Sequence, residues 1–149
     1  MGKLDQKHEM LIQALSTLEK ANDTLTVFTK EGVSHNPHLD YEEEYRGLRD
    51  SAIQRFEYSV DLFWKYLQLY LQDVIEITDV HGPKPVIRKC FSLGLIKEED
   101  AEKALDMIKD RNMTSHIYVE EIAEHIASKV SLYYNVMHHV AENLKPKNK

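Results

Sequence analysis

Apolar residues recur at alternating steps of three and four along most of the chain, which is the spacing of one face of an α-helix. The longest such pattern runs from about Leu48 to Ile77, and Asp50 or Ser51 is suited to cap its start. The same pattern returns over residues 122–144, and regularly spaced leucines occupy residues 4–25. The pattern therefore predicts three long amphipathic helices.

Two shorter helical segments lie between the second and the last of these. Residues 85–93 precede a glycine in the style of a helix C-cap, and residues 98–111 carry apolar residues at helical spacing. No segment alternates as a strand does. We expect one all-α domain spanning residues 1–149, an up-and-down four-helix bundle with one extra short helix. The exception is a long polar connection over residues 29–47, whose acidic cluster at 41–45 has no assigned role.

Charge and composition narrow the class of protein. The only cysteine is Cys90, which cannot form a disulfide within the chain, so a reducing, cytoplasmic compartment is expected. The net charge is −6. No apolar run approaches the roughly 18 residues of a membrane span. Eight histidines invite a metal site, but Glu121 stands one residue too far before His125 for a di-iron motif. We therefore expect no metal, no cofactor and no broad nucleic-acid coat, although a local basic cleft on an acidic body stays open.

The most chemically loaded stretch follows the fourth helix, where Arg111, His116 and Tyr118 stand within eight residues. Positions five apart do not share a face of a straight helix, so Arg111 and His116 converge only at a break. The Thr-Ser pair at 114–115 favours such a break, because its hydroxyls compete with the backbone. The alternative is that Arg111 pairs with Asp110 or helix-end carbonyls while the other two side chains line a helix junction.

A second group of candidates lies on the longest predicted helix. Arg55 and Glu57 flank the apolar residue Phe56, where a groove or a partner helix could use them. Trp64 stands at the edge of the apolar face, suited either to core packing or to presenting a stacking surface. Lys65 is either a ligand-binding cation or the partner of the acidic residue four positions earlier.

Arg88, on the short helix, completes a possible anion site. If Arg55, Arg88 and Arg111 converge, an anionic ligand is implied, with Asp110 and Asn112 beside it. The alternative is that each arginine is a solvated surface charge, which is the commoner case for a basic residue taken alone.

Five stretches of the chain stand out when they are taken together: Ile53–Tyr58, Leu62–Lys65, Val86–Arg88, Phe91–Ile96 and Asp110–Tyr118. In this order and at this spacing, they resemble the nucleotidyltransferase substrate-binding proteins of the HEPN superfamily. The resemblance covers the chain from about Leu48 to the last helix. It implies a HEPN-like helical bundle that forms a homodimer and associates with a separately encoded minimal nucleotidyltransferase, often as a toxin–antitoxin pair. The chain lacks the transferase's own Gly-Ser and paired-Asp signature, so it is not the catalytic transferase.

The resemblance also implies residue roles. Arg111 and His116 match the Arg-x4-His ribonuclease motif of the toxin members, and Tyr118 matches the tyrosine that the partner transferase adenylylates to silence the toxin. Histidine suits proton transfer near neutral pH, and a guanidinium suits a phosphate. One departure is Val119, which stands where the family often has an acidic residue, leaving Glu120 to cap the last helix.

Three hypotheses follow. The first is a subunit that binds a nucleotide or another substrate for the transferase. The second is a metal-independent ribonuclease toxin that acts on RNA at the dimer cleft. The third is a purely structural helical dimer. The first hypothesis uses a set of polar and aromatic residues around a cleft: Arg55, Glu57, Trp64, Lys65, Arg88, Asp110, Arg111 and Asn112.

Overall fold

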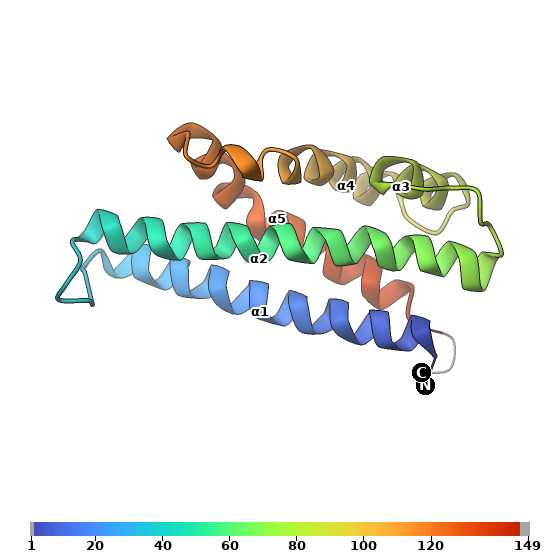
Figure 1. Ribbon diagram of the computed structural model, residues 1–149, viewed down its shortest axis with the longest axis horizontal. Helices are drawn as coiled ribbons and strands as arrows, with labels where there is room; N and C mark the ends of the chain where they lie inside the picture. Colours follow the sequence, from blue (N-terminus) through green and yellow to red (C-terminus); the bar gives the residue numbers. More distant parts are fainter. Residues whose placement is uncertain (1, 147–149) are drawn as a thin grey trace.

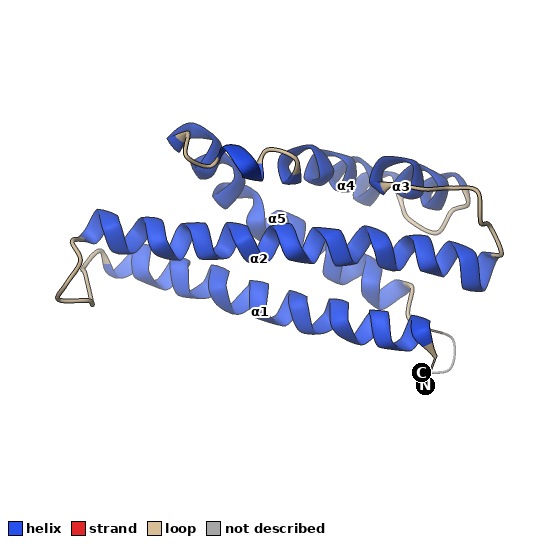
Figure 2. Ribbon diagram, viewed as in Figure 1, coloured by secondary structure: helices blue, strands red, loops and turns tan. Residues whose placement is uncertain are grey.

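Five α-helices make up the architecture of the computed structural model, which describes residues 2–146. No strand occurs in this described part, so the all-α expectation is confirmed (Figures 1 and 2). A π-helical turn follows α2 at Leu71–Ile75, and a 3₁₀ turn precedes α5 at Thr114–His116. The helices are α1 (Lys3–Glu31), α2 (Tyr41–Tyr70), α3 (Pro83–Ser92), α4 (Glu98–Arg111) and α5 (Glu120–Asn143).

The two longest helices, α1 and α2, lie antiparallel and side by side (Figure 1). Helix α5 packs against both of them, and the shorter α3 and α4 lie together along the other side of α2. The turn after α4 therefore lies at the end of the row that α3 and α4 form, next to α2. This row carries the motif that the sequence analysis singled out.

Helix α2 forms the centre of the core with the side chains that the periodicity predicted. Phe56, Val60 and Phe63 are completely buried, and the ring of Phe56 stacks on Tyr133 of α5 at 5.6 Å between centroids. Each fully buried aliphatic or aromatic side chain contributes roughly 1.5–3 kcal/mol to folding. Glu57 and Asp61 each follow a buried residue of this face by one position, so they flank the core and make polar contacts with the end of α4 and the turn after it.

The start of α2 differs from the prediction. The helix begins at Tyr41 rather than near Leu48, and its cap is Asp40 rather than Asp50 or Ser51. The Asp40 carboxylate accepts the Glu43 backbone N–H at 2.8 Å, while the Glu43 carboxylate accepts the Asp40 N–H at 3.1 Å. The acidic cluster is therefore the first turn of a helix, where negative charge is favoured by the helix dipole, and not part of a long loop.

The connection between α1 and α2 is correspondingly short. Gly32 ends α1 with φ of +71°, a left-handed conformation that glycine adopts without strain. The Glu44 carboxylate accepts hydrogen bonds from the backbone N–H groups of Asn36 and His35, and these bonds lower its pKa. The connection is thus tied to the first turn of α2.

Candidate functional site

Arg111, the last residue of α4, is held against α2 by carboxylates. Its Nε and Nη2 each donate to Asp61 at 2.8 Å, and Nη2 lies 3.8 Å from Glu57. The two acids stand one turn apart on α2. The hydrogen bonds from Arg111 to Asp61 raise the pKa of the guanidinium, and its side chain is 27% exposed. Arg111 therefore pairs across helices, and its alternative pairing with Asp110 is not formed.

The predicted break after α4 is present. The chain leaves the α-helix after Arg111 and makes a single 3₁₀ turn from Thr114 to His116. The buried Thr114 hydroxyl donates to the Glu57 carboxylate, which fastens this turn to α2. Helix α5 starts at Glu120, with Val119 as an N-cap that supplies no side-chain hydrogen bond, so the expectation that Glu120 caps this helix is wrong. The position of the turn thus depends on α2 rather than on a strong cap.

His116 and Tyr118 lie outside the helical body and close to each other. The Tyr118 hydroxyl is 3.3 Å from His116 Nδ1, and the rings meet edge to face at 5.9 Å. Tyr118 is 80% exposed. Among residues 2–146, no hydrogen bond joins Arg111 to His116. The motif therefore consists of an anchored arginine and an open histidine–tyrosine pair on one turn.

Asp110 points to the other side of α4, toward α5. Its side chain is 12% exposed, and the carboxylate accepts the Tyr133 hydroxyl at 2.6 Å and lies 3.1 Å from His125 Nε2. Burial and the hydrogen bond to Asp110 raise the pKa of Tyr133. Asp110 thus ties α4 to α5, whereas Asn112 is exposed at the start of the turn.

The three arginines proposed to converge occupy different surroundings. Arg55 lines a groove of about 270 Å³ between α1 and α2, to which neither α3 nor α4 contributes. Arg88 is exposed on α3 and makes no ion pair within the described chain, whereas Arg111 is bound to Asp61. The structure therefore does not bring the three guanidinium groups to one ligand.

Trp64 and Lys65 lie further along α2. Trp64 is half-buried against the core, and the Lys65 ammonium lies 5.8 Å from the centroid of the Trp64 ring. The alternative partner of Lys65, Asp61, is bound to Arg111 instead. Lys65 is thus an exposed cation one helical turn beyond the acid that anchors Arg111.

A second arginine site was missed by the sequence analysis. Arg49 on α2 is 2% exposed, and its Nη1 donates to Glu120 at 2.7 Å and to Glu124 at 3.1 Å, both on α5. The Tyr45 hydroxyl also donates to Glu124, and burial raises the pKa of Tyr45 to about 12. Its position in the helical repeat indicates that it is buried, because Arg49 stands four residues before Ile53, on the buried face of α2.

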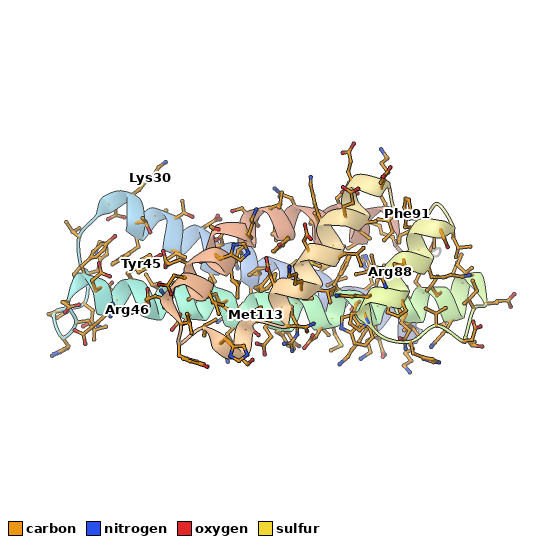
Figure 3. The ribbon with its side chains drawn as sticks, turned by 90° about the horizontal axis from the view of Figure 1, so that it is seen from above. Lys30, Tyr45, Arg46, Arg88, Phe91 and Met113 are labelled. Atoms are coloured by element: carbon orange, nitrogen blue, oxygen red, sulfur yellow. The ribbon has the colours of Figure 1, made fainter. Side chains whose placement is uncertain are left out.

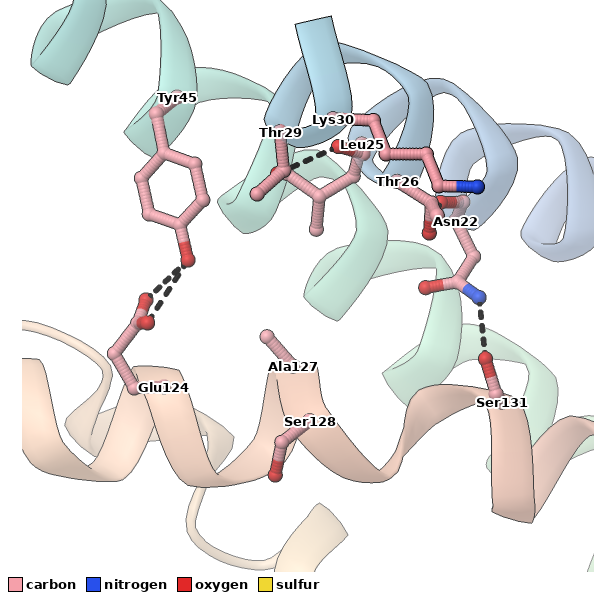
Figure 4. Close-up of a pocket in the computed structure, with 10 residues that line it drawn as sticks. All are labelled: Asn22, Leu25, Thr26, Thr29, Lys30, Tyr45, Glu124, Ala127, Ser128 and Ser131. Atoms are coloured by element: carbon pink, nitrogen blue, oxygen red, sulfur yellow. Dashed lines mark hydrogen bonds between the residues drawn. The ribbon is translucent and has the colours of Figure 1, made fainter. Parts of the chain in front are cut away.

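An open groove of about 550 Å³ lies between α1, α5 and the start of α2 (Figure 4). The Tyr45–Glu124 hydrogen bond stands at one end, and a 2.8 Å hydrogen bond from Asn22 to Ser131 at the other. Lys30 reaches over it from the end of α1. None of the site residues predicted from the sequence lines this groove.

The described residues give no support for a metal site, a membrane-spanning helix or a reactive cysteine. Within residues 2–146, no cluster of three or more His, Cys, Asp or Glu side chains is arranged to hold a metal ion. Over the same residues, no helix combines the length and the apolar character that a bilayer crossing requires. Burial raises the pKa of the Cys90 thiol to about 12, which leaves it a weak nucleophile near neutral pH.

Comparison with known proteins supplies the context for this geometry. The family model described as "Nucleotidyltransferase substrate binding protein like" matches residues 6–146. The "Probable ribonuclease HepT" of Haemophilus influenzae is 31% identical over 100 residues, covering 65% of this chain and 67% of that protein.

Two solved structures share the fold. A Thermus thermophilus protein superposes with a TM-score of 0.72 at 33% identity, covering 91% of this chain and 99% of its own. The Haemophilus influenzae protein HI0074, described as having the fold of a substrate binding domain of a nucleotidyltransferase, gives 0.75 at 25% identity, with coverage of 93% and 99%. The likeness thus extends over nearly the whole bundle.

Proposed function

The chain belongs to the nucleotidyltransferase substrate-binding protein family, and on that basis we propose that it is the partner subunit of a small, separately encoded nucleotidyltransferase. In this proposal, Arg111 and His116 form the active site of a metal-independent ribonuclease. The transferase silences this activity by adenylylating Tyr118. One observation carries this proposal: the Tyr118 hydroxyl is exposed to solvent and lies 3.3 Å from the His116 imidazole.

The residue types fit metal-independent RNA cleavage. The 2′-oxygen of a ribose attacks the adjacent phosphorus, the bond to the 5′-oxygen breaks, and a cyclic phosphate and a 5′-hydroxyl result. His116 takes the 2′ proton or gives a proton to the leaving oxygen. Arg111 presents the guanidinium edge that Asp61 leaves free to the charge that develops on the phosphate.

One histidine in one protonation state performs only one of these two proton transfers. A second copy of the turn, placed opposite the first across a homodimer axis, supplies the other histidine. The exposure of His116 and Tyr118 in the single chain is consistent with such a composite site in a toxin–antitoxin pair.

Modification of Tyr118 explains how the transferase acts on this chain. The phenol oxygen attacks the α-phosphorus of ATP, the bond to the β-phosphate breaks, pyrophosphate leaves, and the phenol proton passes to a base. The product carries a bulky anionic AMP beside His116. This AMP blocks the site by occupancy and by charge.

A second candidate function is nucleotide binding without cleavage. The groove between α1 and α5 favours it, because about 550 Å³ lies within the usual size of a small-ligand site and Lys30 makes no ion pair within residues 2–146. Calorimetry with AMP and ATP tests it. Lys30→Ala should weaken binding if this groove holds the nucleotide, and an unchanged affinity rejects it.

The deciding experiment for the ribonuclease incubates a purified dimer with a small structured RNA in EDTA. His116→Ala and Arg111→Ala should each lower the cleavage rate at least about 100-fold, the usual range for removing a general acid–base or a charge-stabilising group. His38→Ala, which removes an exposed histidine from the α1–α2 connection, is the matched control. Wild-type protein that is folded, dimeric and inactive would contradict the proposal.

The adenylylation step has its own test. Incubation with the transferase and labelled ATP should label wild-type protein and leave Tyr118→Phe unlabelled. Tyr58→Phe is the control, because Tyr58 is also an exposed tyrosine, at 56%. Labelling of Tyr118→Phe at the wild-type level would reject Tyr118 as the acceptor.

A further inference from the structure

The segment around α3 has a charge opposite to that of the whole chain. Residues 80–97 contain no Asp or Glu, whereas the chain carries a net charge of −6. The same segment holds four cationic residues: Lys84, Arg88, Lys89 and Lys97. A local positive region therefore exists on an acidic protein.

Helix α3 sorts its residues into two faces. Val86, Ile87 and Cys90 are completely buried against the bundle. Lys84 and Arg88 are exposed and stand four residues apart, which places them on one outer face.

An exposed aromatic residue continues this outer face. Phe91 follows Arg88 by three residues and is 43% exposed. Figure 3 shows Arg88 and Phe91 on the outside of α3. Among the residues that the structure describes, neither Lys84 nor Arg88 makes an ion pair. We call Lys84, Arg88 and Phe91 the α3 stripe.

The α3 stripe lies on the same side of α2 as the candidate ribonuclease site. Helices α3 and α4 run together along α2, and Arg111 is the last residue of α4 (Figure 1). Lys65 is exposed on α2 one turn beyond Asp61, the residue that holds Arg111. Lys65 therefore adds an exposed cation on the part of α2 between Asp61 and the end from which the chain continues to α3.

We propose that the α3 stripe binds single-stranded RNA outside the point of cleavage. Lys84 and Arg88 contact phosphates, and Phe91 stacks on an unpaired base. Cations that follow a backbone, combined with an exposed aromatic ring, are the general means by which proteins hold single strands without reading their sequence. The choice of RNA as the polyanion rests on the ribonuclease function proposed above.

A strand that cannot be cleaved separates binding from catalysis. The probe is a fluorescent 2′-O-methyl oligonucleotide, which lacks the attacking hydroxyl, and its binding is followed by anisotropy from low to moderate salt. The double variant Lys84→Gln/Arg88→Gln should bind about tenfold more weakly. For this variant, the slope of log K against the logarithm of the salt concentration should be smaller in magnitude by about 1.4, because two phosphate contacts are lost and each contributes about 0.7 on a single strand.

The control removes the same charge elsewhere. Lys3→Gln/Lys20→Gln changes two exposed lysines on α1 and should bind the probe as wild type does. Phe91→Ala should weaken binding about fivefold with an unchanged salt slope, because it removes stacking and no charge. Thermal unfolding of each variant confirms that it is folded.

The outcomes are distinct for the two proposals. The inference is overturned if the α3 double variant and its control bind the oligonucleotide with equal affinity. It is also overturned if the stripe binds an acidic surface of the transferase and does not bind the oligonucleotide. If binding depends on the stripe but His116→Ala cleaves RNA as wild type does, the α3 inference is supported and the ribonuclease assignment fails.

Discussion

Two arginines in this protein are bound by carboxylates from other helices, yet they occupy different environments. Arg49 is 2% exposed and contacts three acids, Asp50, Glu120 and Glu124, while lying 5.8 Å from the Tyr45 ring centroid. Arg111 is 27% exposed and uses one edge for Asp61. The Arg49 side chain is buried among its partners, whereas the Arg111 guanidinium is held along one edge and partly exposed to solvent.

This difference separates a structural role from a chemical one. Arg49 joins the first part of α2 to Glu120 and Glu124 in the first two turns of α5, so it holds the start of α5 against α2. The remaining nitrogen of Arg111, Nη1, has only a 3.5 Å contact to Thr114. Arg111 therefore keeps a donor for a ligand, whereas Arg49 supports the scaffold that holds the turn.

The largest expected effect is on the free energy of unfolding, which should fall more when Arg49 is replaced than when Arg111 is replaced. Arg49→Met should lower the free energy of unfolding by about 2 kcal/mol, because it removes a buried charge and leaves three acids that rehydrate at the surface. Arg111→Met should cost about 1 kcal/mol or less, because that pair is partly solvated. Urea unfolding measures both, and equal losses would remove the distinction between the two sites.

The next effect concerns the anchor of Arg111. Asp61→Asn should lower kcat for RNA cleavage about tenfold, because a guanidinium held by only one hydrogen-bonding oxygen loses its fixed orientation. Asp61→Glu should restore part of the rate. Asp73→Asn, an exposed acid beyond the end of α2, is the control. A rate for Asp61→Asn equal to wild type would show that Arg111 needs no positioning.

The smallest effect is the pH dependence of the Arg49 site. The hydrogen bond from Arg49 lowers the pKa of Glu120 below its ordinary value of 4.5. A carboxyl with a lowered folded-state pKa contributes full stability above its unfolded pKa and loses it as the pH falls through the folded pKa. The difference in melting temperature between wild type and Arg49→Met should therefore be constant from about pH 6 to 7 and narrow below about pH 4. A difference that widens in acid would contradict this sign.

Much of the fold could be predicted from local patterns. The apolar face of α2 from Ile53 onward, the bounds of α4 and the break at Thr114 all follow from spacing and side-chain chemistry within a few residues. The start of α2 was missed because an acidic run reads equally as a polar loop or as a helical first turn. Its capping box with Asp40 decides between them.

The sequence by itself determined the helical class, the buried face of each helix and the motif carried by Arg111, His116 and Tyr118. Only the tertiary structure decided that Arg111 is held by Asp61, 50 residues earlier, and Arg49 by Glu120, 71 residues later. Helical periodicity is a local property of neighbouring residues. Which charged side chains meet depends on how the packed helices are rotated about their axes, and the burial of the common core sets that rotation.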